Sequence, residues 1–401
     1  GEEIERLRRQ IMEQIDLTRT VEDEEVYQLI EAQVRDFARE RMLTLGEREA
    51  VVQTLFYSLR KLDVLQELLE DPTITEIMVN GTEHIFVERQ GRVEELEKHF
   101  DSVGQLEDLI QQIVSRVNRT VNLASPIADA RLEDGSRVHV VLAPVALNGP
   151  ILTIRKFPEP ITMERLIELK SISREAAAFL QKAVERGLNI FISGGTGSGK
   201  TTILNAMSGY IPQEERVITI EDSAELQIRH VTNLVSLETR VENRDGSQEI
   251  SMRDLIRASL RMRPDRIIVG EVRGGEALEM LQAMNTGHDG SISTGHANSA
   301  KDMLSRLETM VLMAAELPLA AVRSQIGSAL DLMVHVGRMR DRSRKVLEIT
   351  EVIGYENGEI RLSPIYQFQE SGETASGQVE GALVQVGRFE GRRRFAGGSA
   401  F

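Results

Sequence analysis

The amino-acid sequence predicts an α/β protein with two domains and a helical N-terminal extension. Two observations support this fold class. Four short, strongly apolar segments between residues 188 and 296 alternate with helical stretches, an alternation that is typical of a parallel sheet covered by helices. Upstream of them, strand-like segments surround Asn-Gly and Asp-Gly pairs, which short antiparallel hairpins favour as turns. We therefore expect a different type of sheet in each domain.

The composition limits the classes of function. The chain has 401 residues, of which 41% are hydrophobic and 28% charged, an ordinary balance for globular domains. The formal net charge of −15 disfavours nucleic acid as a partner, because nucleic-acid binders usually present a basic face. The lack of cysteine in the sequence excludes disulfides, cysteine zinc sites and thiol catalysis, and it is compatible with a reducing cytosol.

The sequence contains no apolar run of the length that a membrane-spanning helix needs. The first ten residues, GEEIERLRRQ, are too charged for a secretory signal. Because the first residue is Gly1 instead of methionine, we expect a trimmed or tagged sequence. Any contact with a membrane is expected to pass through partner proteins.

Residues 1–57 are expected to form helices. Apolar residues recur at helical spacing in two stretches, with charged residues on the other faces: Ile4, Leu7, Ile11 and Ile15, then Val26, Leu29, Ile30, Val34 and Phe37. A small helical bundle or packing arm is the simpler interpretation of this pattern. A helix pair that binds a partner protein is the alternative.

Residues 58–158 predict a compact α/β domain with an antiparallel sheet. A short helix with leucines at positions 62, 65, 68 and 69 ends at Asp71-Pro72, because proline cannot continue it. The segments ITEIMVNG and HIFVERQGRV predict two strands around a turn at Asn80-Gly81. A helix is expected at about residues 105–120. The strand-like segments RLEDGSRVHVVLAP and ILTIRKF follow, with a hairpin turn at Asp134-Gly135.

The segment FPEP at residues 157–160 predicts the boundary between the domains, because prolines disfavour the continuation of a helix or a central strand. Residues 159–370 then form the second domain, with LNIFIS, RVITIED, RIIVGE and GSISTGH as its expected parallel strands. Residues 371–401 are rich in Gly, Ser and Glu and become basic at residues 392–394. We expect them to form a weakly ordered tail.

The most specific motif is GGTGSGKT at residues 194–201, which fits G-x-x-x-x-G-K-[ST] between an expected strand and the helical stretch TTILNAMSGY. Glycines allow backbone N–H groups to surround phosphate oxygens, and the helix N-terminus adds the positive end of a dipole. Lys200 would reach the β- and γ-phosphates, and the Thr201 hydroxyl would contact magnesium. A glycine-rich turn without a ligand is the alternative.

Two carboxylates follow the next expected strand. The stretch RVITI at residues 216–220 ends in Glu221 and Asp222, and Glu225 lies one turn later. A parallel strand directs the residues at its carboxyl end into the crevice where ligands bind. These acids would therefore orient water or hold magnesium through water. Capping of the following helix is the alternative role.

The third expected strand, RIIV at residues 266–269, leads into Gly270 and Glu271. In many nucleotide-cleaving enzymes such a strand ends in an aspartate that helps to hold magnesium. Here Gly270 would leave room near the phosphates, and Glu271 would supply the acid for magnesium-bound or attacking water. A purely structural glutamate is the alternative.

Two of the seven histidines, His288 and His296, lie in the fourth strand region, and each follows a glycine. Zinc is a poor interpretation, because the sequence has no cysteine and no further ligand at a typical spacing. Beside a phosphate-binding loop, the two histidines are expected to sense the γ-phosphate or to couple the site to a neighbouring copy. A structural hydrogen-bonding role is the alternative.

In this order, the segments GGTGSGKTT, TIEDSAEL, RIIVGEVRGGEAL and TGHDGSISTGHANS resemble the Walker A motif, acidic box, Walker B motif and histidine box of the secretion-ATPase superfamily. The superfamily comprises motors of type II and type IV secretion, type IV pili and archaella. The resemblance covers roughly residues 58–367. It implies a RecA-like P-loop domain after a smaller, PAS-like α/β domain.

The subgroup can be argued from further segments. The lack of cysteine disfavours the type II secretion and pilus extension ATPases with a tetracysteine zinc module, and the AIRNLI-type motif of retraction ATPases is not found. The type IV secretion traffic ATPases and the archaellum motor are nearer relatives. LLEDPTITEIMVNGTEHIFVERQGRV and SQIGSALDLMVHVGRMRDRSRKVLEITEV, together with the helical extension, look like the tight-adherence pilus assembly ATPases of the CpaF type.

The resemblance implies roles for individual residues. Glu221 would be the general base, Glu271 the Walker B acid, and His288 and His296 would report on the γ-phosphate. Magnesium would be held by Thr201, Glu271 and Asp222, partly through water. The phosphates would be bound by Gly194, Gly195, Thr196, Gly197, Ser198, Gly199, Lys200, Thr201 and Thr202.

The family also brings arginines of the N-terminal domain to the nucleotide, where a guanidinium offsets the charge that develops during phosphoryl transfer. The matching positions are Arg131 and Arg137 in RLEDGSR, and Arg155 lies in RKF near the domain boundary. Alternatively, Arg131 and Arg137 pair with acids of the same turn, for which Asp129, Glu133 and Asp134 are the candidates.

The resemblance implies an ATP- and Mg²⁺-dependent homo-hexameric motor, cytoplasmic and peripheral to the membrane, that assembles or retracts a tight-adherence pilus through an inner-membrane platform protein. A type IV secretion traffic ATPase or an archaellum motor is the alternative within the superfamily. A nucleic-acid motor and a nucleotide-gated scaffold without turnover are the alternatives outside it, and the acidic composition and the intact Lys200, Glu221 and Glu271 argue against them.

Overall fold

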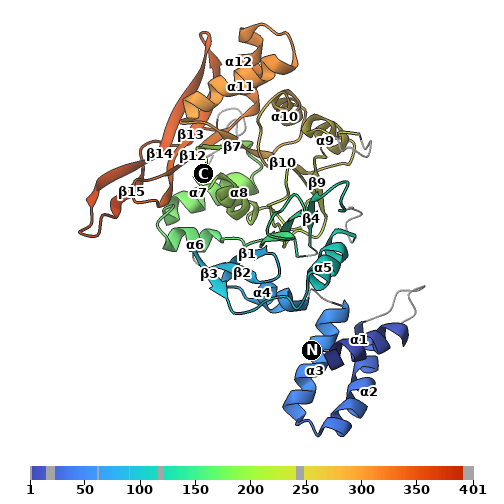
Figure 1. Ribbon diagram of the computed structural model, residues 1–401. Helices are drawn as coiled ribbons and strands as arrows, with labels where there is room; N and C mark the ends of the chain where they lie inside the picture. Colours follow the sequence, from blue (N-terminus) through green and yellow to red (C-terminus); the bar gives the residue numbers. More distant parts are fainter. Residues whose placement is uncertain are drawn as a thin grey trace. The chain divides into compact units, whose positions relative to one another are not determined.

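The computed structural model describes residues 2–14, 23–60, 63–89, 91–115, 121–132, 134–240 and 248–391. The chain forms two compact units, Gly1–Pro158 and Glu159–Phe401 (Figure 1). Each unit has its own sheet and its own apolar core. The division falls inside the segment FPEP.

The first unit begins with three helices, α1 (Glu2–Gln14), α2 (Asp23–Arg41) and α3 (Leu45–Arg60). Their apolar stripes meet in a small separate core that contains Leu7, Ile11, Val26, Ile30, Val34, Val52, Leu55 and Phe56. The helix α3 continues past residue 57, which the sequence predicts as the end of the extension. Ile15 and Leu62, which complete two of the apolar patterns, lie outside the described residues.

The α/β part of the first unit contains a six-stranded antiparallel sheet in the order β3-β2-β1-β6-β5-β4. Leucines and isoleucines of α5 pack with the apolar residues of the sheet in one core. The elements are η1 (Asp63–Leu65), α4 (Gln66–Glu70), β1 (Ile74–Asn80), β2 (His84–Arg89), β3 (Arg92–Leu96), α5 (Val103–Ser115), β4 (Ile127–Arg131), β5 (Arg137–Val141) and β6 (Ile151–Arg155).

Glycines form the turns of this sheet. The chain reverses at Gly81 (φ +70°) and near Gly135 (φ +87°), where a left-handed backbone favours glycine, as the Asn-Gly and Asp-Gly pairs predict. A third reversal, at Gly91 (φ +76°), divides HIFVERQGRV into β2 and β3. The expectation of a single strand there was wrong, because a tight turn between Arg89 and Arg92 folds the segment back on itself.

The second unit contains a nine-stranded sheet in the order β15-β14-β13-β12-β7-β11-β10-β8-β9. The strands from β12 to β9 are parallel, and β13, β14 and β15 are added to them in antiparallel pairs. The strands are β7 (Ile190–Gly194), β8 (Val217–Glu221), β9 (Leu234–Glu238), β10 (Arg266–Val269), β11 (Ile292–His296), β12 (Leu332–Arg338), β13 (Arg344–Glu356), β14 (Glu359–Glu373) and β15 (Val379–Gln385).

Helices cover both faces of the parallel strands. One core joins the sheet to α6 (Met163–Glu168), α7 (Arg174–Glu185) and α8 (Lys200–Ser208). The other joins it to α9 (Met252–Ser259), α10 (Glu276–Asn285), α11 (Ala300–Ala314) and α12 (Leu319–Ala329). Alternation along β7 serves both cores, since Ile190 and Ile192 face the first and Phe191 faces the second.

The expected weakly ordered tail from residue 371 was wrong for its described part. β14 extends to Glu373, and β15 pairs with it along its whole length. Val379 and Leu383, four residues apart, are buried (8% exposed each), and Leu383 joins the first core. The glycine- and serine-rich composition concealed this apolar pattern. Residues 392–394 lie outside the described part of the chain.

Every helix in the described ranges is too short or too polar to cross a membrane.

Candidate functional site

The glycine-rich segment connects the strand β7 to the helix α8. β7 ends at Gly194, and α8 begins at Lys200 with Gly199 as its N-cap. Gly197 (φ +68°) and Gly199 (φ +96°) have left-handed backbone angles, which other residues adopt only with strain. The segment therefore curls over the amino end of α8, where the first N–H groups lack partners within the helix.

Gly194 permits a close approach between two segments. A Cβ atom at this position would collide with Ser198 Oγ and would lie 2.7 Å from the carbonyl oxygen of Val336 on β12. Ser198 Oγ is buried and has no hydrogen-bond partner in the described structure. A glycine cradle, an unpaired buried hydroxyl and a helix N-terminus together fit the oxygen-rich phosphates of a nucleotide.

The Lys200 ammonium lies across the loop. Its Nζ donates hydrogen bonds to the carbonyl oxygens of Gly194 (3.1 Å) and Gly195 (3.0 Å). Burial lowers the pKa of Lys200, although the nearby Glu271 carboxylate opposes this effect. Phosphate oxygens are stronger acceptors than neutral carbonyls. Lys200 could therefore donate to a bound phosphate in place of these two carbonyl oxygens.

The strand order brings several predicted residues to the edge of the sheet where the loop lies. Across the sheet from β7 come β11, β10 and β8, all parallel, so their carboxyl ends meet at one edge. His296 ends β11 opposite Gly194, Glu271 follows β10, and Glu221 ends β8.

Glu221 is the most buried carboxylate at this edge, with 4% of its surface exposed. Its Oε1 accepts hydrogen bonds from the N–H groups of Glu225 (3.0 Å) and Leu226 (3.2 Å). Burial raises the pKa of Glu221, and these two hydrogen bonds only partly offset the rise. A carboxylate with a raised pKa is a better proton acceptor near neutral pH than an ordinary glutamate.

Gly270 explains how Glu221 fits. The Gly270 N–H donates to the Ile220 carbonyl oxygen (2.8 Å), so the glycine lies directly beside the end of β8. A Cβ atom at Gly270 would lie 2.8 Å from Glu221 Cγ. The sequence predicts that this glycine leaves room near the phosphates, and in the structure the space is filled by the side chain of Glu221.

Arg273 joins the other two acids and was not singled out from the sequence. Its guanidinium donates to Glu271 Oε2 (2.9 Å) and lies 3.5 Å from Asp222 Oδ2. Asp222 also accepts a hydrogen bond from Thr239 Oγ1 (3.1 Å). The only signal for Arg273 is its place two residues after Glu271, in GEVRG. In this structure Arg273 occupies acceptor positions that a cation would use.

The described residues include no group of three or more His, Asp or Glu side chains arranged to hold a metal ion. Thr201 lies in the first turn of α8, and Glu271 and Asp222 are near one another through Arg273. One hydroxyl and two carboxylates suit Mg²⁺, which keeps several waters and takes its other ligands from phosphates. The residues therefore fit a magnesium ion that is held mainly by substrate and water.

The structure separates the two predicted histidines. His296 ends β11, whereas His288 precedes β11 and lies at the opposite edge of the sheet. The strand between them spans about 13 Å, at roughly 3.3 Å per residue. His288 Nδ1 is buried without a hydrogen-bond partner among the described residues. His288 and His296 therefore do not lie at one edge of the sheet, although they are close in sequence, and the expected role of His288 stays a prediction.

The three predicted arginines of the first unit form one row. Arg131 on β4 pairs with Arg137 on β5, and Arg137 pairs with Arg155 on β6. Residues directly opposite on neighbouring strands point to the same face, with Cβ atoms about 5 Å apart. The row ends at Glu76 on β1, the other partner of Arg155. Of the acids considered as partners, Asp129 contacts His139 (2.7 Å) and Glu133 lies outside the described residues.

Arg344 is a second residue that the sequence did not indicate. A Cβ atom at Gly199 would lie 3.5 Å from Arg344 Cδ, so the stem of this arginine covers the end of the glycine-rich loop. Its guanidinium makes no hydrogen bond or ion pair with any other described residue. Arg344 starts β13, far along the chain, and only the strand order β7-β12-β13 brings it to the loop.

Comparisons with known proteins identify the family of this chain. The sequence matches the family described as Type II/IV secretion system protein over residues 58–374. The conjugal transfer protein TrbB of Rhizobium radiobacter is 34% identical over 317 residues, 78% of this chain and 94% of the relative. The type IV secretion system protein PtlH of Bordetella pertussis (strain Tohama I / ATCC BAA-589 / NCTC 13251) is 34% identical over 315 residues, 72% of this chain and 93% of the relative.

Among solved structures, the pilus retraction motor PilT with bound ADP matches with a TM-score of 0.54 and 22% identity, over 76% of this chain and 82% of that one. At this identity the likeness concerns the fold alone. The family match, the α/β fold and the glycine-rich cradle lead to one conclusion. The chain belongs to the type II/IV secretion system protein family and is an ATPase.

Proposed function

We propose that the chain works as a homo-hexameric ATP-driven motor at the cytoplasmic face of a membrane and powers a type IV secretion or conjugal transfer apparatus through a membrane platform protein. The main support is the glycine cradle between β7 and α8 with the buried Glu221 at the same edge of the sheet. The strand order of the two sheets also supports a RecA-like ATPase domain and a PAS-like domain before it.

In the proposed reaction, the N–H groups of residues 194–202 and the Lys200 ammonium bind the phosphates. Thr201, Glu271 and Asp222 would hold Mg²⁺, partly through water, and the ion would neutralise phosphate charge. Glu221 accepts a proton from the attacking water, for which its raised pKa suits it. Arg273 has to release the two acids before they can serve the cation.

Residues outside the loop complete the proposal. His296, opposite Gly194 on β11, is placed to respond to the terminal phosphate. Arg344 adds a positive charge at Gly199, in the part of the loop that holds the α- and β-phosphates. The row of Arg131, Arg137 and Arg155 supplies cations to the nucleotide of the same or a neighbouring copy during turnover.

The type of apparatus is inferred from the relatives. TrbB is a conjugal transfer protein and PtlH a type IV secretion protein, and the chain covers more than nine-tenths of each. These relatives favour a secretion or conjugation motor over a tight-adherence pilus motor. One observation favours the pilus motor as a second candidate. The helical extension, which is part of the resemblance to the tight-adherence ATPases, forms a three-helix bundle that lies almost entirely before the matched residues 58–374.

The decisive test is steady-state ATP hydrolysis by the purified chain with Mg²⁺, alongside its mass in solution. A hexamer whose turnover disappears in Glu221→Gln, with nucleotide binding retained, is the expected result. Absence of turnover in a hexamer would leave only a nucleotide-gated scaffold. Stimulation by single-stranded DNA or RNA would instead favour a nucleic-acid motor, against the proposal that nucleic acid is not a partner.

A further inference from the structure

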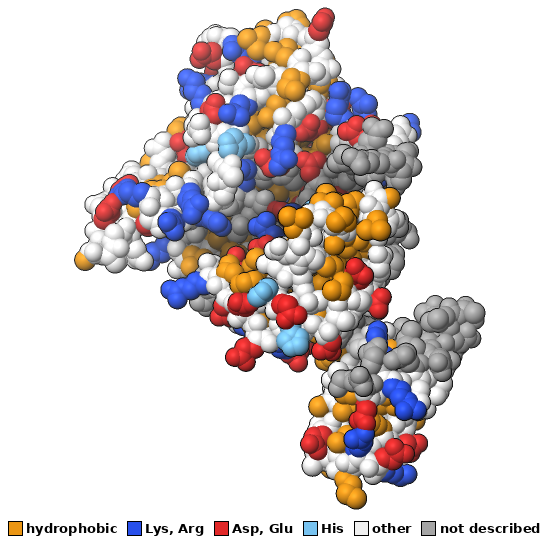
Figure 2. Space-filling view, in the orientation of Figure 1, with side chains coloured by type: hydrophobic (Ala, Val, Ile, Leu, Met, Phe, Trp, Pro, Cys, Tyr) orange, Lys and Arg blue, Asp and Glu red, His pale blue; other side chains and the backbone are white. Residues whose placement is uncertain are grey.

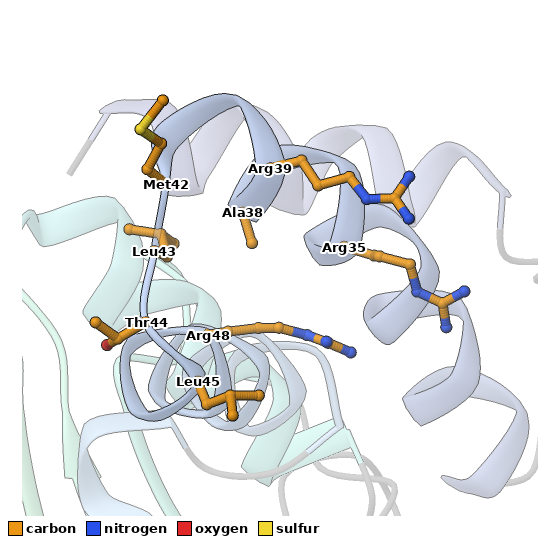
Figure 3. A pocket seen from close by; sticks show the side chains of 8 residues that line it. All are labelled: Arg35, Ala38, Arg39, Met42, Leu43, Thr44, Leu45 and Arg48. Atoms are coloured by element: carbon orange, nitrogen blue, oxygen red, sulfur yellow. The ribbon is translucent and has the colours of Figure 1, made fainter.

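A pocket of about 420 Å³ lies in the three-helix bundle, where α2 ends and α3 begins (Figure 3). Its walls come from the last two turns of α2, the connection at residues 42–44 and the first turn of α3. None of its residues belongs to the ATPase site. The pocket lies before residue 58, where the match to the family begins.

One end of the pocket is basic. Arg35 and Arg39 are four residues apart on α2 and therefore lie on one helix face, and Arg48 reaches the same end from α3, as Figure 3 shows. Arg35 and Arg39 form no hydrogen bond or ion pair within the described part of the chain. Among the described residues, the one ion pair of Arg48 is with Glu31, at 3.7 Å. Like charges at this spacing on a helix are unfavourable, unless an anion joins them.

The other end is apolar and unusually exposed. Met42 and Leu45 are 91% and 77% exposed, although both line the pocket. Met42 has φ +55°, a left-handed angle that methionine adopts only under strain. The strained turn is held from both sides, because Leu43 N–H donates to the Ala38 carbonyl oxygen (3.1 Å) and Thr44 caps α3 together with Glu47. The bundle thus holds two large apolar side chains in water beside two guanidinium groups that have no partner among the described residues.

We propose that this pocket binds an acidic peptide segment of a partner protein, with a large apolar side chain beside its carboxylates. The carboxylates would pair with Arg35 and Arg39, and the apolar side chain would cover Met42 and Leu45. Both features of the pocket are then satisfied by one occupant. Burial of these two exposed side chains would add a favourable apolar contribution to the binding of the segment.

The surroundings favour a peptide over a membrane surface. The four arginines between residues 35 and 49 are matched by four carboxylates, at Asp36, Glu40, Glu47 and Glu49. Figure 2 shows acidic and basic side chains interspersed over the visible face of the bundle. A broad anionic lipid surface would meet both signs of charge and gain little, whereas a narrow segment contacts the basic end of the pocket alone.

The test uses the full chain and two labelled synthetic peptides, one with glutamates flanking leucine and phenylalanine and one with glutamines in place of the glutamates. Fluorescence anisotropy should show binding of the acidic peptide, weakened by salt, and at least about tenfold weaker binding of the glutamine peptide. The double variant R35E/R39E should bind the acidic peptide at least about tenfold more weakly, and R35K/R39K should retain most of the affinity.

Two further variants and one surface complete the design. M42S/L45S should weaken binding of both peptides, and R261E/R263E, an equal charge change at exposed positions of the other unit, should leave it unchanged. ATP turnover should stay normal in R35E/R39E, so a failure here is distinct from a failure of the ATPase proposal. Equal binding of both peptides, unchanged binding by R35E/R39E, or binding only to vesicles of phosphatidylglycerol would overturn the proposal.

Discussion

At the scale of single residues, the site depends on the fit between Gly270 and Glu221. The glycine has no Cβ where one would lie 2.8 Å from Glu221 Cγ, and the buried carboxylate uses that space. Gly270, which has no side chain, thereby leaves the space that the carboxylate of Glu221 occupies at the end of the neighbouring strand. This arrangement separates the roles of the two acids, since Glu221 is buried and Glu271 is half-exposed and paired with Arg273.

The substitution Gly270→Ala should displace Glu221 and lower kcat strongly, with ATP affinity little changed. The added methyl group should also lower the free energy of unfolding by about 1–3 kcal/mol, because the buried side chain of Glu221 already fills the space that it would need. Steady-state kinetics, nucleotide titration and urea unfolding measure the three effects. Gly46→Ala, where a Cβ meets nothing within 4 Å, is the matched control and should lower none of them.

The raised pKa of Glu221 predicts a pH dependence of kcat. As the proposed general base, Glu221 works only when ionised, so turnover should fall as the pH decreases through a pKa above the ordinary value of about 4.3 for glutamate. Glu221→Gln should lower kcat by roughly 10²–10⁴ and abolish this limb. A pH–rate profile at saturating ATP is the measurement. An acid limb that persists in the residual activity of the variant would assign it to another group.

The raised pKa of Glu221 also predicts that Glu221→Gln, which should lower turnover, raises the stability of the folded state at neutral pH. A carboxyl group with a raised pKa in the folded state stabilises it below the ordinary pKa, and this contribution is lost as the pH rises through the raised value. At neutral pH, Glu221→Gln should therefore be more stable to urea than the parent chain while it loses turnover.

Arg344 should act on binding more than on the chemical step. Its stem lies against Gly199, beside the α- and β-phosphate part of the loop, so it would stabilise ATP and ADP alike. Arg344→Ala should raise the Kd of both nucleotides about fivefold, for a loss of about 1 kcal/mol, and leave kcat nearly unchanged. Arg342→Ala, in the adjoining turn, serves as the control. A selective loss of kcat would contradict the assignment.

At the scale of elements, β12 forms a second support for the glycine-rich loop. It pairs in parallel with β7, and His335 and Ser193 are hydrogen-bonded neighbours, with Nδ1 and Oγ 2.9 Å apart. Burial lowers the pKa of His335, and the carboxylates of Glu348 and Asp302 only partly oppose this effect. The strand that carries the loop is thus joined to its neighbour by a histidine whose protonation the fold disfavours.

This pair predicts a loss of stability in mild acid. Because protonation of His335 is disfavoured in the folded state, the unfolded state binds more protons once the pH falls below about 6.5, and stability declines from there through the lowered pKa. Urea unfolding at several pH values should show this decline, and His335→Asn should reduce it. An identical pH dependence in the variant would exclude His335 as its source.

Local patterns predicted much of both sheets, and long-range pairing accounts for the rest. The glycine-rich loop, Glu221 and Glu271 follow short apolar stretches, so a few neighbouring residues are enough to predict them. Arg344 could not be found this way, because its place depends on β12 and β13 lying next to β7. His288 is the opposite case. It lies close to His296 in the sequence, but the length of β11 separates the two histidines in the structure.

At the scale of the whole molecule, the residues that we propose for the chemistry come from both units. The nucleotide cradle belongs to the second unit, and the row of Arg131, Arg137 and Arg155 belongs to the first. We propose that this row contacts phosphate during the motor's cycle.

The double variant R137A/R155A should lower kcat at least about 10²-fold, as expected when guanidinium groups no longer offset transition-state charge. Arg92→Ala, an exposed arginine on β3 of the same sheet, is the control and should leave kcat unchanged. Mixed hexamers of R137A/R155A with Glu221→Gln identify the copy that is served. Recovered turnover would mean that the arginines act on a neighbour, and no recovery that they act within one chain.

The space shared by Gly270 and Glu221 also limits how this site can evolve. The two positions lie on different strands, yet they draw on one small volume. A chain with a larger residue at position 270 has room only for a shorter acid, aspartate, at position 221. A glutamate at position 221 requires a glycine at position 270. Substitutions at positions 221 and 270 should therefore be retained together in evolution, because the side chain at one position limits the size of the side chain at the other.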